Sequence, residues 1–167
     1  MSELTQKITR LLEEQPGLRT VEMAALLGIS EWQLVSRLPA ELCRGLAGEH
    51  VRTILEQVAE WGPVTTIVEV AGSVFEVKAA LPRGRLGHGY FNLFGQPGQL
   101  HGHLKLEAMA HVALLSKPHR GKEAHAMVFY DAEGHCIFKI YLGRDERGEL
   151  FPEQVRAFNA LKELAND

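Results

Sequence analysis

The sequence predicts an α+β fold, in which helices cover one face of a large, mostly antiparallel β-sheet. Residues 1–62 have apolar side chains at helical spacing, interrupted by Gly and Pro. The segment that follows is rich in Val, Thr, Ile and Phe between short turns, and a helical pattern returns near residue 152. The 167 residues, 46% hydrophobic and 23% charged, are typical of one globular domain. We therefore expect a helical N-terminal segment, 1–62, that is not an independent domain, and a sheet with a C-terminal helix over 63–167.

The N-terminal segment is predicted to hold four helices. Thr20 and Ser30 are the expected N-caps of the second and third helices, and Gly28 ends the second. The helices are expected at 4–14, 21–27, 31–38 and 50–61. The first three have the outline of a helix-turn-helix, which gives two alternatives: a DNA-binding regulator, or a helical appendage that packs on the larger domain.

Charge argues against DNA binding. Residues 1–49 carry seven acidic and five basic side chains, and the predicted recognition helix has one of each, Glu31 and Arg37. A surface that binds phosphates needs several Lys or Arg on one face. We therefore expect no nucleic-acid partner.

The second part of the chain is predicted to contain about seven strands. Val64–Val70 and Val74–Leu81 form one hairpin, and a central hairpin follows between Arg85 and Leu106. A short strand is expected at 111–116. The hairpin of 125–131 and 135–142 is almost continuously apolar, so we expect it to be buried on both faces. A terminal helix is expected from residue 151 or 152 to 164.

The central hairpin has the most unusual polar pattern. Its two strands meet at the turn Gly95–Gln99, and alternation along each strand separates polar from apolar side chains. Keeping the apolar sets together pairs Asn92 with His103 and Tyr90 with Lys105. One face then carries the polar residues of both strands, which are His88, Tyr90, Asn92, His101, His103 and Lys105.

This polar face has two interpretations. It is either a solvated outer face, or a site for a flat, anionic ligand that carries a metal. Imidazole or phenolate can bind the metal, while cationic and hydroxyl groups can hold carboxylates. Seven of the eight histidines lie between residues 88 and 135, but their spacing fits no zinc signature.

Composition limits the remaining function classes. The net charge of −3 gives no general attraction to nucleic acid or anionic lipid. The two cysteines form no CxxC motif, which fits a reducing compartment. The N-terminus is charged throughout and apolar runs are short, so we expect a cytoplasmic protein that does not insert into membranes.

Five segments together resemble a known family. They are WGPVTTIVEV, HGYFNLFG, HGHLKLE, AMVFYDAEGHCIFKIYLGRDERGEL and EQVRAFNAL, and they span nearly the whole chain. This combination resembles the cytosolic haem-utilisation carriers of the ChuX/HutX family. The resemblance implies a haem-binding homodimer in the bacterial cytoplasm, with an α+β fold, that passes haem to a downstream haem-utilising or haem-degrading protein.

The resemblance also assigns site residues. A family histidine matches His103, the expected ligand of the haem iron. A second family histidine falls at Glu69, and a carboxylate is a poor partner for ferrous haem. Tyr90, His88, His101 or a water are the alternatives for a second ligand. Independently of the resemblance, side-chain charge makes Lys105, Arg85 and Arg144 the cations that can pair with the haem propionates. For Arg144 the alternative is a structural ion pair with Asp145 or a turn contact.

A carrier is expected rather than an enzyme. The sequence contains no nucleophile–base arrangement, phosphate loop or dinucleotide fingerprint. Related haem-handling proteins can degrade haem, so a haem-degrading enzyme stays as the alternative.

Overall fold

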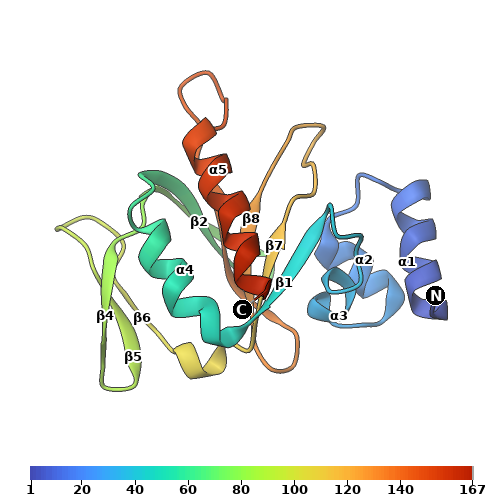
Figure 1. The fold of residues 1–167 in the computed structure, drawn as a ribbon, viewed down its shortest axis with the longest axis horizontal. Coiled ribbons are helices and arrows are strands. Elements are labelled where there is room, and N and C mark those ends of the chain that lie inside the picture. The colour runs from blue at the N-terminus through green and yellow to red at the C-terminus, as the bar shows by residue number, and fades with distance from the viewer. Residues whose placement is uncertain (167) are drawn as a thin grey trace.

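The computed structural model describes residues 1–166 and consists of two sheets and five α-helices (Figure 1). The larger sheet is antiparallel and has six strands in the order β1-β7-β8-β9-β2-β3. Its strands are β1 (Cys43–Ala47), β2 (Pro63–Val70), β3 (Ser73–Ala80), β7 (His111–Leu115), β8 (Ala126–Tyr130) and β9 (Cys136–Leu142). The predicted α+β class with a large antiparallel sheet is confirmed.

The second sheet projects from the body and is called the arm below (Figure 1). It consists of β4 (Arg83–Gly87), β5 (Tyr90–Phe94) and β6 (Gly102–Leu104), paired in that order. The helices are α1 (Glu3–Glu14), α2 (Thr20–Leu27), α3 (Glu31–Val35), α4 (Val51–Val58) and α5 (Pro152–Leu161).

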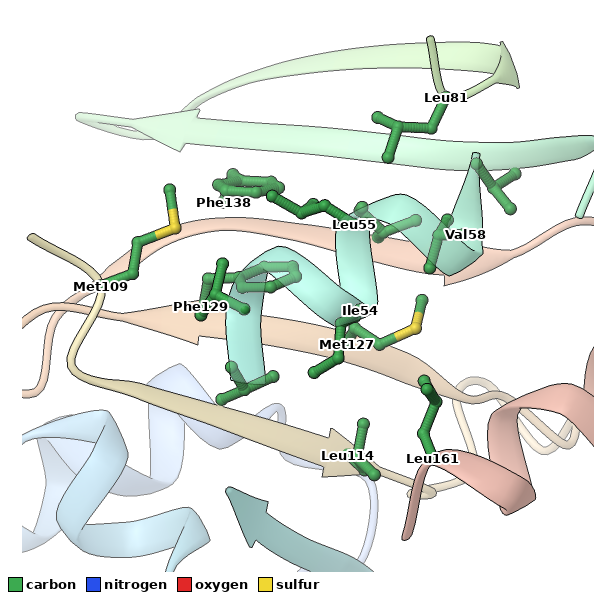
Figure 2. Packing of buried hydrophobic residues seen from close by; sticks show 14 of the residues in the cluster. Ile54, Leu55, Val58, Leu81, Met109, Leu114, Met127, Phe129, Phe138 and Leu161 are labelled. Atoms are coloured by element: carbon green, nitrogen blue, oxygen red, sulfur yellow. The ribbon is translucent and has the colours of Figure 1, made fainter. Parts of the chain in front are cut away.

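The main core lies between the six-stranded sheet, α4, α5 and the arm. α4 is amphipathic and buries Val51, Ile54, Leu55 and Val58 completely. Figure 2 shows Ile54 and Leu55 among Met127, Phe129 and other side chains of the sheet. Phe91 and Leu93 of β5 belong to the same core, so the arm is fixed to the body by its inner face.

A second core lies on the opposite face of the sheet and corrects one prediction. Along β7, Val112 and Leu114 belong to the main core, whereas Ala113 and Leu115 pack with helices α1–α3. Successive side chains of a strand point to opposite faces, so helices cover both faces rather than one. The five residues of β8 are all buried, as predicted, but β9 alternates between buried and partly buried residues, so the prediction for this hairpin is confirmed only for β8.

The N-terminal segment is not wholly helical, which corrects a second prediction. β1 pairs with β7 along five residues, from Cys43↔Leu115 to Ala47↔His111. β1 and α4 therefore belong to the sheet and its main core, and only α1–α3 form the separate helical layer. Gly45 in β1 leaves room for the ring of Trp32, since a Cβ there would lie 2.9 Å from its Cη2.

Helices α2 and α3 are held against the sheet. The ring of Trp32 stacks on His111, with centroids 4.2 Å apart and planes at 7°. Leu34 and Val35 of α3 are fully buried. The N-cap of α2 is Arg19 rather than Thr20, whose hydroxyl donates to Glu31. This packing corresponds to the appendage alternative of the sequence analysis.

Among residues 1–166, no helix is long and apolar enough to cross a bilayer.

Candidate functional site: the outer face of the arm

His103 lies on the outer, exposed face of the arm. β5 and β6 pair in the predicted register, with Asn92 opposite His103 and Phe91 opposite Leu104. Phe91 and Leu93 point inward to the core and are 1% and 5% exposed. The alternating residues Tyr90 and Phe94 point outward and are 40% and 55% exposed. The imidazole of His103 is therefore open to a ligand.

Asn92 fixes the orientation of the His103 ring. Its amide nitrogen donates to the carbonyl oxygens of Arg85, at 3.2 Å, and Gly87, at 3.1 Å. Only the Nδ2 atom can donate two hydrogen bonds, so Oδ1 faces His103. The His103 Nδ1–H donates to this oxygen at 2.6 Å. In the neutral tautomer that fits this hydrogen bond, the lone pair of Nε2 is available to a metal.

Tyr90 is the second side chain, beside His103, that can bind a metal. The two ring centroids are 6.0 Å apart and the planes are inclined by 68°, an edge-to-face arrangement. Both side chains rise from the same face of the arm. An imidazole and a phenol that can each bind iron are therefore brought together, as predicted.

His88 occupies a different place from the one predicted. It was expected on a strand beside Tyr90 and Asn92, but it lies in the two-residue turn between β4 and β5. His88 and Gly89 have φ values of 53° and 85°. Positive φ at both central residues defines a type I′ turn, which matches the twist of a hairpin. His88 therefore lies at the end of the arm and not on its face.

Lys105 and His101 flank β6. The predicted pair Tyr90–Lys105 is absent because β6 ends at Leu104 and a 3-10 turn, Leu106–Ala108, follows. Lys105 Nζ lies 3.6 Å from the carboxylate of Glu107. Both side chains are exposed, so this ion pair contributes little to stability. His101 is exposed and directly precedes β6.

Glu69 is not brought together with His103 within one chain. Val64 of β2 belongs to the main core, so the odd-numbered Glu69 points to the other face of the sheet. There it lies 3.6 Å from the guanidinium of Arg19 and lines a cleft of about 1010 Å³. The arm packs on the opposite side of the sheet, through Phe91 and Leu93.

Two of the other clustered histidines, His125 and His111, have structural contacts. His125 is hydrogen-bonded to Ser116 at 2.8 Å and to Glu123 at 2.6 Å, which closes the base of the β7–β8 loop. His111 stacks on Trp32. Within residues 1–166, no group of three His, Cys, Asp or Glu side chains is arranged to hold a metal ion. Single-residue ligation of an iron already held by a porphyrin needs no such group.

Comparison with known proteins identifies the family. A family model described as haem utilisation ChuX/HutX matches residues 44–161. The chain belongs to this family. It is 52% identical to the intracellular heme transport protein HutX of Vibrio cholerae over 163 residues, which cover 98% of this chain and 84% of HutX. The family resemblance seen in the sequence is thereby confirmed.

Solved structures agree with the fold of a ChuX/HutX protein. The crystal structure of ChuX matches with a TM-score of 0.88 and 33% identity, covering 95% of this chain and 98% of that one. The heme-degrading enzyme ChuS of Escherichia coli O157:H7 matches with a TM-score of 0.74. At 19% identity, and with 46% of ChuS covered, that likeness shows the fold alone.

Asn92 and Phe94 also lie on the face of the candidate site, and the sequence analysis assigned neither of them a role. The predicted register placed Asn92 opposite His103, and this was the available signal for its role. Phe94 received no role, although it alternates with Tyr90 and Asn92. One face of the arm thus presents two potential metal ligands, the aromatic ring of Phe94 and cations. This combination suits a flat ligand that contains a metal and carboxylates.

Proposed function

We propose that this chain is an intracellular haem carrier that binds haem on the outer face of the arm and passes it to a haem-utilising or haem-degrading protein. The observation that carries the proposal is the exposed His103 imidazole, whose Nδ1 is bound to Asn92 and whose Nε2 is open. The names of two relatives support it: an intracellular heme transport protein, and a structure titled as the heme binding protein ChuX.

In this proposal, a single side chain of the arm binds the haem iron. The two axial positions of haem iron lie on opposite faces of the porphyrin. His103 and Tyr90 approach from the same side, so only one of them can bind the iron at a time. We assign His103 as the ligand, because its hydrogen bond to Asn92 sets the tautomer that a metal needs. Tyr90 then packs beside the bound imidazole.

A site that binds haem from one side suits delivery of the haem to another protein. Only one of the two haem faces contacts the arm, and the other stays open to a second protein surface. Release then requires the loss of one iron–nitrogen bond and of contacts with exposed side chains. His101 and Lys105 adjoin the site at β6, where they contact the edge of the ligand. His88 in the turn and Glu69 on the far face do not contact the iron.

We further propose that the protein acts as a homodimer. β3 forms an outer edge of the six-stranded sheet, and its apolar residues Val74 and Phe75 are 51% and 65% exposed. Neighbouring Val70 of β2 is 59% exposed. Long exposed strands with apolar side chains favour association with another chain. Light scattering should give the dimer mass for the native chain, and Phe75→Glu should weaken the dimer. A native monomer at micromolar concentration would contradict the proposal.

The carrier proposal is tested by titrating purified protein with hemin. The native chain should produce a shifted Soret band at one equivalent. His103→Ala should weaken binding at least tenfold and change the ligand-field bands, while Tyr90→Phe should leave the bands nearly unchanged. His135→Ala is the matched control, because this exposed strand-end histidine lies beside Asp131 and Glu133, away from the arm. Equal affinities for His103→Ala and native protein would refute the assigned ligand.

The alternative of a haem-degrading enzyme is tested with the same complex. Oxidative opening of haem needs a pocket that admits and directs O₂, whereas His103 stands on an open sheet face. We expect the Soret band to persist after addition of reductant and O₂ with catalase present. Loss of the band with formation of a linear tetrapyrrole would favour the enzyme.

A further inference from the structure

Arg85 shares a cross-strand row with His103. Arg85 pairs with Asn92 across β4 and β5, and Asn92 pairs with His103 across β5 and β6. Directly opposed residues point to the same face of a sheet. Two strand spacings separate the Cα atoms of Arg85 and His103, a distance of roughly 10 Å. A flat ligand centred on His103 therefore extends over the strand that carries Arg85.

The guanidinium of Arg85 is held in place without being neutralised. Its Cζ lies 5.0 Å from the ring centroid of Phe94, a cation–π contact on the outer face. In the part of the chain that the structure describes, Arg85 forms no salt bridge. Stacking on a ring leaves the edge of the guanidinium, with its N–H groups, free to bind a carboxylate.

Arg83, two residues earlier on the same strand, is instead already paired with a carboxylate. Its Nε lies 2.9 Å from Oε1 of Glu60, and its Nη2 donates to Oε2 at 3.1 Å. This two-point contact occupies the fork of the guanidinium. Lys105, the third cation beside this face, is paired with Glu107. Of these three cations, Arg85 is the one whose charge is not already matched.

We propose that Arg85 binds a propionate carboxylate of the porphyrin and so selects porphyrins with free propionates. This inference rests on the proposed function, in which the iron lies over His103. The ring then has a defined direction on the arm: the iron at β6, the macrocycle across Asn92 and Phe94, and a propionate at β4. The contact is charge-assisted and oriented, because a guanidinium matches a carboxylate with two parallel hydrogen bonds.

The test compares hemin with hemin dimethyl ester, in which both propionates are capped, in the same detergent. Arg85→Gln should weaken hemin binding about tenfold, as expected for a partly exposed charged hydrogen bond. The ester should bind the native protein more weakly than hemin by a similar factor, and Arg85→Gln should not weaken it further. Arg83→Gln is the matched control and should leave the ratio of hemin to ester affinity as in the native protein.

Metal-free protoporphyrin IX separates this inference from the iron ligand. It keeps the propionates but has no iron, so its binding should respond to Arg85→Gln and not to His103→Ala. Equal loss of hemin and ester affinity in Arg85→Gln would mean that the substitution disturbs the arm, and would overturn the propionate contact. Native-like hemin binding by Arg85→Gln would also overturn it while leaving His103 as the ligand. Failure of the native protein to bind any of these porphyrins would overturn the proposed function as well.

Discussion

Asn92→Ala tests whether the orientation of His103 matters for haem binding. The substitution removes three hydrogen bonds: those to the carbonyl oxygens of Arg85 and Gly87, and the one to His103 Nδ1. Each of these hydrogen bonds stabilises the fold by a net amount of order 1 kcal/mol, so the free energy of unfolding should fall by roughly 1–3 kcal/mol. Loss of a hydrogen bond that orients a metal ligand typically lowers metal affinity by about 10- to 100-fold. We expect hemin affinity to fall within that range.

A matched control shows whether a loss of hemin affinity in Asn92→Ala results only from a less stable fold. Gln154→Ala also removes three hydrogen bonds, to the amide of Gly143 and the carbonyls of Trp61 and Pro63, but in the body of the protein. Gln154 is 2% exposed, so its loss should destabilise the fold at least as much as Asn92→Ala. Urea unfolding and hemin titration are measured on both variants. Hemin affinity within twofold of native for a folded Asn92→Ala, or an equal loss in Gln154→Ala, would refute the reasoning.

Three further results are expected. Ile54→Ala, at a fully buried position of α4, should lower the free energy of unfolding by about 2–5 kcal/mol in urea, and a loss below 1 kcal/mol would mean that α4 is loosely packed. His88→Asn should keep native stability and hemin affinity, because Asn tolerates the positive φ of the turn; a tenfold loss of hemin affinity would instead make His88 a ligand. Burial raises the pKa of the Cys43 thiol from 9.0 to about 12, so its contribution to stability is complete below pH 9 and is lost as the pH rises toward 12. The free energy of unfolding should therefore fall less steeply between about pH 9 and pH 11 in Cys43→Ala than in the native chain, and equal slopes would contradict this.

The sequence predicted the hairpin that carries Asn92 and His103 because the relevant signals are local, but it did not predict that β4 joins this hairpin in a separate three-stranded sheet. Alternation of polar and apolar residues fixed the register of Asn92 and His103, since a slip by one residue would expose Phe91 and Leu93. The turn at His88 was missed because the favoured signal for a type I′ turn is Asn-Gly or Asp-Gly, and here histidine takes the first position.

The features that the sequence did not predict depend on distant contacts. β1 is short and contains Gly45, and it forms only because β7, far along the chain, pairs with it. Helices on both faces follow from the continuous burial of β8, a pattern that the sequence analysis recognised without concluding that two helical layers must cover the sheet. The role of Asn92 depends on two backbone carbonyls of β4, which alternation cannot locate.

The position of haem on the arm can be mapped directly by NMR on the ¹⁵N-labelled native protein. Ferric hemin is paramagnetic and broadens nearby resonances, while zinc protoporphyrin serves as the diamagnetic reference. We expect broadening centred on Tyr90, Asn92 and His103, with the amides of α1–α3 unaffected. Broadening centred instead on the cleft beside Glu69 and Arg19 would contradict haem binding on the arm.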